Sequence, residues 1–337
     1  MVEKVDVYSD KSNGSKIYAF DYLRVIALVM ILYDHLGGFY NPNWIVKKII
    51  DFFFAVPLDI IQDFGAFGVS LFFLLSGFLF TYNGNYKNEA KKTFKKTMKT
   101  YVGCLMAFFL FYILQRLTWI IKTTYWSQFS TKQWIESMTL VGYFTGHGDV
   151  INGTTWFLIP LFLFYLVRIG YAWIYEKIKP EYNFLFLELF VLLIMFLLKG
   201  FHLMGMILGE IFRKERRISI FNGILLLIVN YVLMVIWFWV FAREYHDTYC
   251  YFVSFIYSLF LIIIFAIFKE QFKKSQMIDF CCKISLSVYL MHMTFGSFLL
   301  SFFLYISIPF SLSFVITIAV IFLISYIHMN ILSRIIR

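Results

Sequence analysis

The sequence predicts an all-α, polytopic membrane protein, and three observations lead to that fold class. Hydrophobic residues make up 61% of the 337 residues, and charged residues make up only 15%. The mean hydropathy is +0.76, which is far too apolar for a soluble chain of this length. The apolar residues are gathered in long runs, and about 20 residues are needed to cross a bilayer as a helix. We therefore expect about ten transmembrane helices.

Ten apolar runs are the candidate spans. By residue number they are 20–38, 64–82, 101–121, 156–175, 183–199, 201–212, 218–241, 249–268, 284–306 and 309–332. The sixth run is short, but omitting it would place the basic stretch Arg213–Arg217 on the opposite side from the other basic segments. Residues 1–19 are polar, so we expect a cytoplasmic tail followed by one transmembrane domain over residues 20–337.

The distribution of basic residues predicts the topology. With both termini in the cytoplasm, the inner segments hold 21 of the 30 basic residues and the outer segments hold five. Because basic residues collect in cytoplasmic loops, this asymmetry favours a multi-pass protein of the plasma or inner membrane with both ends inside. Anionic membrane lipids also account for the net charge of +10, so we expect no nucleic-acid partner. The cysteine spacing predicts no metal site.

The first run, FDYLRVIALVMILYDHL (Phe20–Leu36), contains Arg24 and His35. At about 100° per residue, the two side chains point within about 20° of each other and lie about 16 Å apart along the helix axis. Ionisable groups inside a span usually line a cavity, which favours a functional stripe on this helix. The alternative is that Arg24 extends to the inner headgroups and His35 caps the outer end.

Three further stretches carry motifs in the same order along the chain. FGVSLFFLLSGFLF (Phe67–Phe80) contains an L-S-G-F element with Ser76, WFL (Trp156–Leu158) begins a span, and SLSVYLMHMTF (Ser285–Phe295) contains Tyr289 and His292. Together with D-x-L-R-x-I-A (Asp21–Ala27) and His35, these motifs resemble the acyltransferase 3 family of integral membrane O-acyltransferases. The resemblance covers residues 20–332 and includes no appended esterase-like domain.

The resemblance implies transfer of an acyl group, with acetyl the expected one, to a hydroxyl of a cell-envelope or exported glycan. The donor would be cytoplasmic acyl-CoA, a co-substrate, so no bound cofactor is expected. His35 would be catalytic, either removing the acceptor proton or transiently carrying the acyl group, with Arg24 in the same site. Proteins of glycan biosynthesis or export are the expected protein partners.

A basic segment, KKTFKKTMKTY (Lys91–Tyr101), precedes the third run. Family members usually place arginines here, suited to the phosphates of the donor, whereas this chain has only lysines. Lysine supplies positive charge but lacks the planar bidentate fork of arginine. We assign donor binding to Arg24, Lys96, Lys99 and Ser76; the alternative for the lysines is a solvated cytoplasmic loop.

Several other polar residues are candidates for the site or for its surroundings. The further candidate site residues are His292, Tyr289, Trp156 and Asp34. Asp34 adjoins His35, but neighbouring helical positions diverge by about 100°, so we expect it to meet another helix or the outer interface. Arg168, Glu188 and Glu210 are expected in interhelical ion pairs. His202 and His328 are expected to be structural.

Two other classes of protein remain as alternatives. A non-enzymatic transporter or flippase for a glycan or a lipid-linked sugar would also have many helices and intramembrane charges. No repeat between the two halves of the sequence supports it, and it leaves the motifs unexplained. A scaffolding membrane protein leaves Arg24 and His35 unexplained.

The topology can be tested by labelling introduced cysteines in intact cells with a membrane-impermeant reagent. We expect Lys91→Cys to react only after permeabilisation, because the basic segment is cytoplasmic. Lys132→Cys, in an expected outer loop, should react without permeabilisation and serves as the control. Labelling of position 91 in intact cells would overturn the topology.

Overall fold

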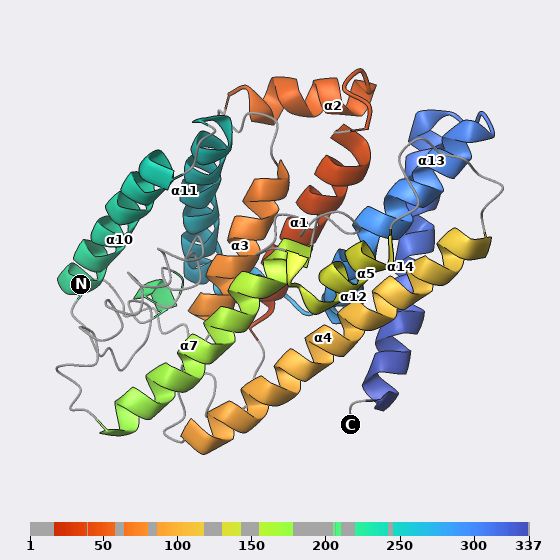
Figure 1. Ribbon diagram of the computed structural model, residues 1–337. Coiled ribbons are helices and arrows are strands. Elements are labelled where there is room, and N and C mark those ends of the chain that lie inside the picture. Colours follow the sequence, from red (N-terminus) through yellow and green to blue (C-terminus); the bar gives the residue numbers. More distant parts are fainter. Residues whose placement is uncertain are drawn as a thin grey trace. The chain divides into compact units, whose positions relative to one another are not determined.

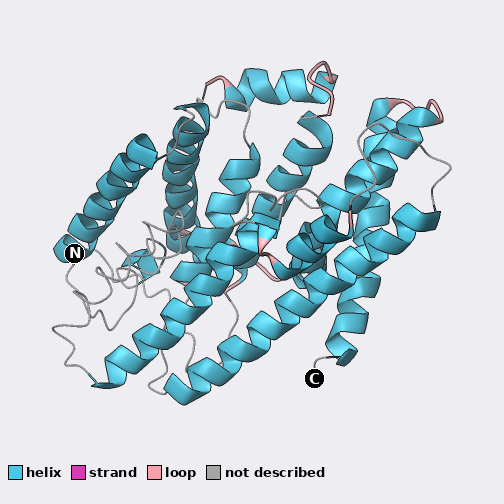
Figure 2. Ribbon diagram, in the orientation of Figure 1, coloured by secondary structure: helices cyan, strands magenta, loops and turns pink. Residues whose placement is uncertain are grey.

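The computed structural model describes residues 17–38, 40–57, 64–79, 86–117, 130–142, 155–177, 205, 207–209, 220–241 and 245–335. These residues form eleven α-helices and contain no strand (Figure 2). The all-α fold class is therefore confirmed for this part of the chain.

Figure 1 labels the helices. The α-helices are α1 (Tyr18–Tyr33), α2 (Ile45–Ile50), α3 (Phe64–Phe78), α4 (Tyr86–Leu117), α5 (Thr131–Thr139), α7 (Leu158–Lys177), α10 (Ile220–Phe241), α11 (Tyr245–Ile267), α12 (Gln276–Met291), α13 (Ser297–Tyr305) and α14 (Phe310–Ile335). The shorter helical turns are the π turns η2 (Asp34–Gly38), η3 (Asp51–Ala55) and η6 (His292–Gly296), and the 3-10 turns η4 (Thr155–Phe157) and η5 (Lys269–Gln271).

Eight of the ten expected spans coincide with helices, and runs 183–199 and 201–212 lie outside the described residues except for Gly205 and residues 207–209. Among the described residues, two helical stretches are long and apolar enough to cross a membrane, Gln276–Tyr305 and Phe310–Ile335. Four apolar helices are shorter: Phe64–Phe78, Leu158–Ile174, Ile220–Leu233 and Val253–Ile267. The number of spans and their orientation stay predictions.

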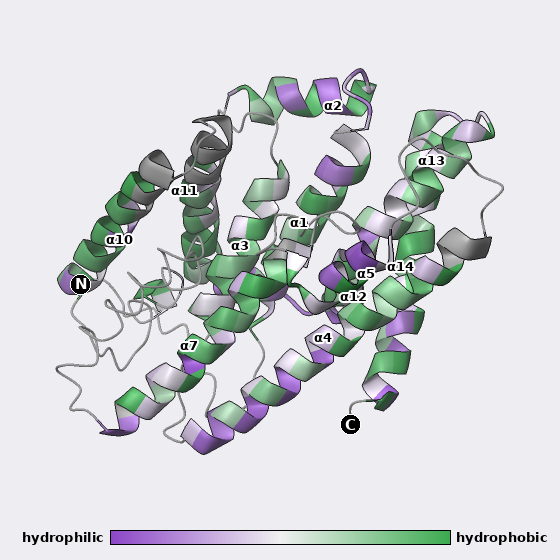
Figure 3. Cartoon of the chain, viewed as in Figure 1, coloured by the Kyte–Doolittle hydropathy of each residue, from purple (hydrophilic) through white to green (hydrophobic). Residues whose placement is uncertain are grey.

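Helix α4 corrects one detail of the sequence analysis. The basic segment Lys91–Tyr101 is not a loop but the N-terminal part of one helix of 32 residues. Figure 3 shows α4 passing from a largely hydrophilic beginning to a hydrophobic continuation. Glu89, Thr93 and Thr100 are buried while most of the lysines are exposed, so this segment of α4 has a buried and an exposed side although it is too polar to be a span.

The chain divides into two compact units. The first consists of residues 1–31, 53–93 and 163–282, and the second of residues 32–52, 94–162 and 283–337.

In the first unit, α3 packs along α11 (Figure 1). The Ser258 hydroxyl donates to the carbonyl of Phe67 at 3.3 Å, and the Phe67 ring lies 6.3 Å from that of Tyr257. Helix α3 also approaches α1 closely, because a Cβ on Gly68 would lie only 2.6 Å from the Ala27 carbonyl oxygen. Only glycine permits this approach, which gives the Gly68 of the motif a packing role.

An ion pair joins α4 to α7 in the same unit. Both Nε and Nη2 of Arg168 donate to Oε1 of Glu89, at 3.0 and 2.6 Å. The expectation of an ion pair for Arg168 is confirmed, and because the Glu89 carboxylate is buried, its charge needs this partner. Glu188 and Glu210 lie outside the described residues.

In the second unit, a buried histidine connects three helices. Nε2–H of His328 on α14 donates to the Gly103 carbonyl of α4 at 3.0 Å, because a carbonyl can only accept. Its Nδ1 therefore accepts from the Ser287 hydroxyl of α12 at 2.9 Å. This arrangement agrees with the structural role expected for His328; His202 lies outside the described residues.

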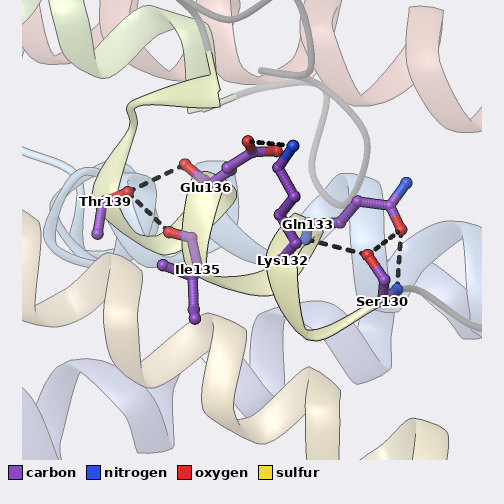
Figure 4. Close-up of polar contacts among 6 residues, drawn as sticks. All are labelled: Ser130, Lys132, Gln133, Ile135, Glu136 and Thr139. Atoms are coloured by element: carbon purple, nitrogen blue, oxygen red, sulfur yellow. Dashed lines mark hydrogen bonds and ion pairs between the residues drawn. The ribbon is translucent and has the colours of Figure 1, made fainter.

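Helix α5 has well-defined ends and packs on α4 in the second unit. Figure 4 shows the capping box at its start, where the Gln133 N–H donates to the Ser130 hydroxyl and the Ser130 N–H donates to the Gln133 side chain. Lys132 and Glu136 form an ion pair at 3.8 Å (Figure 4). The buried Trp134 ring lies against the rings of α4, at 5.1 Å from Tyr112.

Two π turns of the second unit, η2 and η6, contact each other. Turn η2 directly follows α1, and η6 lies between α12 and α13. The fully buried Leu36 of η2 occupies the space beside Gly296, where a Cβ would lie 2.8 and 2.9 Å from the Leu36 methyl carbons. The same Cβ would lie 2.9 Å from Ile321 of α14. Glycine at position 296 thus lets the two turns meet.

This packing predicts a coupling between positions 296 and 36. Gly296→Ala should lower the free energy of unfolding by about 1–3 kcal/mol through overpacking. Leu36→Ala should lower it by about 2–5 kcal/mol through the lost side chain. In the double variant the vacated space accepts the new methyl group, so the combined loss should fall short of the sum by about 0.5–3 kcal/mol. Unfolding of the detergent-solubilised protein measures each term.

The matched control is Gly38→Ala in η2, the π turn that also contains Leu36. A Cβ at position 38 would lie 3.6 Å from the Lys47 side chain, at ordinary contact distance. It should unfold close to wild type. Additive effects of the 296 and 36 changes would contradict the packing of the two turns.

Candidate active site

The candidate site is formed where η2 meets η6. Nδ1 of His35 lies 2.8 Å from Nε2 of His292, although the two residues are 257 positions apart in the chain. The two rings are nearly parallel, with an interplanar angle of 6° and centroids 5.1 Å apart. The structure thus brings together two histidines that the sequence analysis named separately. Single π turns occur often at functional sites, because the extra residue re-aims a side chain.

The hydrogen bonds fix which ring nitrogen carries each hydrogen. Nδ1 of His292 lies 2.7 Å from the Tyr289 carbonyl oxygen, which can only accept, so this nitrogen carries the hydrogen. Nε2 of the neutral His292 ring is then an acceptor, and the hydrogen between the two rings belongs to Nδ1 of His35. Nε2 of the neutral His35 ring is left with its lone pair.

The two rings differ in accessibility. His292 is fully buried, whereas the His35 side chain is 26% exposed. A buried ring can orient its neighbour but cannot itself meet a substrate. His35 is therefore the ring that can accept a proton, and His292 is the ring that holds it in place.

Asp34 lies beside His35 but makes no direct hydrogen bond with it. Its Oδ2 is 3.9 Å from Nε2 of His35, at the limit of an ion pair. The two side chains were expected to diverge by about 100°, but both residues lie in the π turn η2, where these atoms come within 3.9 Å. Asp34 is close enough to stabilise positive charge on the His35 ring once it has taken up a proton.

Tyr289 of the SLSVYLMHMTF motif lies between His292 and Phe157 of the WFL motif. The buried Tyr289 ring packs on Phe157 at 4.8 Å and on His292 at 5.4 Å. The described contribution of Tyr289 to the site is therefore its carbonyl and its ring face. Trp156 lies in η4 next to Phe157, and its side chain is outside the described part of the structure.

Arg24 lies on α1 and bonds within its own helix. Its Nη1 donates to Oδ1 of Asp21 at 3.2 Å, and the Arg24 side chain is 39% exposed. Helix α1 runs directly into η2, so Arg24 and His35 lie on one helical run. The π turn changes the angle per residue before His35, so the uniform 100° step behind the expected shared stripe does not apply to the last residues.

The remaining donor-binding candidates lie on α3 and α4. Lys96 is exposed and Lys99 is half-buried, both on the basic N-terminal part of α4. The Ser76 hydroxyl donates to the Phe72 carbonyl at 2.8 Å within α3, which leaves its oxygen able to accept but not its hydrogen to donate. The donor-binding roles of Lys96, Lys99 and Ser76 stay predictions.

The sequence analysis missed the acceptor that orients His292, which is a backbone carbonyl and has no signature in the sequence. It also missed Glu89 as the partner of Arg168, because the residue lay in an expected loop. The chemical capacity of the site is proton transfer: the neutral, partly exposed His35 ring is held through its Nδ1 by a buried second imidazole.

The comparison with protein families is decisive for the class of reaction. No curated protein and no solved structure matches the chain. The family described as "Acyltransferase domain" matches residues 17–330, which include the π turns η2 and η6 and every candidate site residue. This is a membrane family, and its reaction needs an acyl donor and an acceptor, which disfavours a transporter without chemistry. The chain therefore belongs to the acyltransferase 3 family and is an acyltransferase.

Proposed function

We propose that the protein is a multi-pass O-acyltransferase of the plasma or inner membrane. It moves an acyl group, with acetyl the expected one, from cytoplasmic acyl-CoA to a hydroxyl of a cell-envelope or exported glycan. The observation that carries the proposal is the bond from His35 to His292, which leaves Nε2 of His35 without a hydrogen on a side chain that is 26% exposed.

The proposed step is base-assisted attack on a thioester. Nε2 of His35 removes the proton from the acceptor hydroxyl while the hydroxyl oxygen bonds to the thioester carbonyl carbon. The tetrahedral intermediate collapses, the C–S bond breaks, and the departing sulfur takes the proton back from the His35 imidazolium. The ester and free CoA are the products, and His35 returns to its starting tautomer.

His292 is a positioning residue in this scheme. It accepts from Nδ1–H of His35 before, during and after the proton transfer, so the His35 ring keeps one orientation throughout. The Tyr289 carbonyl in turn holds His292. An acyl group carried on Nε2 of His35 is the alternative course, and it would use the same lone pair.

The donor is proposed to enter from the cytoplasmic side, where its phosphates meet positive charge. Arg24 offers a guanidinium whose present partner, Asp21, occupies Nη1 at 3.2 Å. Lys96 and Lys99 supply weaker, solvated attraction from α4.

We predict that His35→Ala lowers acyl transfer by about 100-fold to 10,000-fold, the usual range for a lost general base. His292→Ala should lower it less, because His35 remains but loses its orientation. Since His292 acts through His35, the double variant should be no slower than His35→Ala alone. Mass spectrometry of envelope glycans from cells that express each variant measures the transfer.

Cys104→Ala is the control, because it changes a buried residue of α4 in the same unit without touching either histidine. It should keep wild-type transfer. Normal acylation by a well-expressed His35→Ala protein would refute the assignment of His35. A double variant much slower than His35→Ala would give His292 a separate role.

We predict that Arg24→Gln weakens binding of a nonhydrolysable acyl-CoA analogue about tenfold to a hundredfold, equivalent to one charge-assisted contact of about 1.5–3 kcal/mol. Lys96→Gln and Lys99→Gln should weaken it less, and raising the salt concentration should reproduce their effect. Binding to the purified full chain across ionic strength provides the measurement.

Lys132→Gln on α5 is the matched control for removal of an exposed lysine and should bind the donor as wild type does. Unchanged affinity in Arg24→Gln would remove Arg24 from the donor site. Weakened donor binding in His35→Ala alone would exchange the roles assigned to the two residues.

A further inference from the structure

Helix α2 has its apolar residues on the outside. Ile45, Ile49 and Phe52 are 63%, 50% and 70% exposed. Ile45 and Ile49 are four positions apart and share one face of α2, and Phe52 follows in the π turn η3; we name these three residues the α2 face. On the opposite side, Lys47 and Asp51 form an ion pair between Nζ and Oδ2. The helix is therefore amphipathic, with the arrangement opposite to that of a helix on a soluble protein.

The polar side of α2 is turned toward the rest of the second unit, to which α2 belongs. The stem of Lys47 lies beside Gly38, where a Cβ would be 3.6 Å from Cδ of the lysine. The preceding residue, Trp44, is buried, and its ring packs on Phe314 at 4.9 Å and on Tyr33 at 6.2 Å. These contacts fix the rotation of α2, so the α2 face points away from this unit.

Trp44 also fixes the depth of α2. Its indole N–H donates to the Ser311 hydroxyl at 2.9 Å, and Ser311 is the second residue of α14. In the proposed multi-pass protein α14 crosses the bilayer, so the first turn of α14 lies at a bilayer surface. Trp and Tyr side chains are enriched at that level.

The segment is too short to cross the bilayer. Helix α2 has six residues and turn η3 has five, and together they extend about 16 Å. The hydrocarbon core of a bilayer is roughly 30 Å thick. Figure 1 shows α2 lying across the direction of α14. A short amphipathic helix that starts at the surface and runs across a spanning helix matches the geometry of an interfacial helix.

We propose that the α2 face is a lipid-binding surface that lies in the bilayer interface, with Ile45, Ile49 and Phe52 among the acyl chains of phospholipids. The exposed Lys48 at its edge is placed to meet headgroup phosphates, since the sequence provides an ammonium next to the apolar face. Membership in a membrane family places lipid beside the chain, which favours lipid over a second copy as the occupant.

The surface has a consequence for the active site. The Trp44 ring lies against Gly37, where a Cβ would be 2.8 Å from Cζ3, and Gly37 follows His35 by two residues. The interfacial helix therefore holds the π turn η2 at the bilayer surface. The lipid surface itself does not depend on the proposed chemistry, because no step of acyl transfer enters the argument.

Photo-crosslinking of the wild-type full chain in phosphatidylglycerol and phosphatidylethanolamine liposomes tests the surface. A phospholipid with a diazirine in its acyl chain is activated by light, and the labelled residues are mapped by mass spectrometry. We expect adducts on Ile45, Ile49 and Phe52 and none on Lys47 or Asp51. Val315 and Leu323, exposed on α14, are the internal positive control.

A variant separates lipid contact from chance labelling. Ile49→Asp should lose the adducts on Ile45 and Phe52 while α14 keeps its own, because a carboxylate is driven out of the acyl-chain region. Lys48→Gln, the matched exposed control, should keep all adducts. Labelling of α14 without labelling of the α2 face would overturn the proposal, as would a disulfide-linked dimer of Ile49→Cys that forms in place of lipid adducts.

Discussion

The candidate site in the second unit depends on the hydrogen bond between His35 and His292. This bond joins the end of the first helical run to the end of α12 over 257 positions of sequence. Its direction is set by a further contact, the Tyr289 carbonyl, which obliges His292 to present its Nε2 lone pair. The Tyr289 carbonyl oxygen thus determines, through the His292 ring, that the hydrogen of the neutral His35 ring is on Nδ1 and not on Nε2.

Such a bond requires two helices to approach at defined depths, and the two π turns and their glycines meet that requirement. Each π turn widens the helix locally and re-aims its histidine. Leu36 then fills the space beside Gly296, and Trp44 fills the space beside Gly37. Because these side chains are close-packed, a change in either turn is transmitted to the histidine that it carries. The packing is therefore close around the residues that orient His35, while the His35 side chain itself stays 26% exposed.

Most of the helices could be predicted from the sequence, because apolar runs of span length leave few other structures open to the chain. Helix α2 was not predicted, since it is too short to register as a span. The helical course of Lys91–Tyr101 was also missed, because charge counting identifies the side of the membrane and not the backbone conformation. His35, His292 and Tyr289 were all named from motifs. Their mutual contacts were not, because a backbone acceptor and a one-residue widening of a helix leave no periodicity in the residues themselves.

The choice of a second imidazole as the partner of His35 has a physical rationale in an apolar setting. The first unit buries the carboxylates Asp21 and Glu89, and each is paired with an arginine. In the described part of the second unit, the fully buried polar side chains are all histidine, serine or threonine. An unpaired charge in low-dielectric surroundings is costly, whereas two neutral imidazoles satisfy each other with one hydrogen bond.

A neutral partner also affects the proposed chemistry. A carboxylate on Nδ1 would stabilise the imidazolium more strongly than a neutral ring does. The proton on Nε2 is then readily given to the departing sulfur, so one group can serve as base and then as acid. Asp34, 3.9 Å from Nε2, is close enough to moderate the transient charge without a hydrogen bond that would occupy the reacting nitrogen. The same geometry that avoids a buried charge at rest thus suits a base that must release its proton within each cycle.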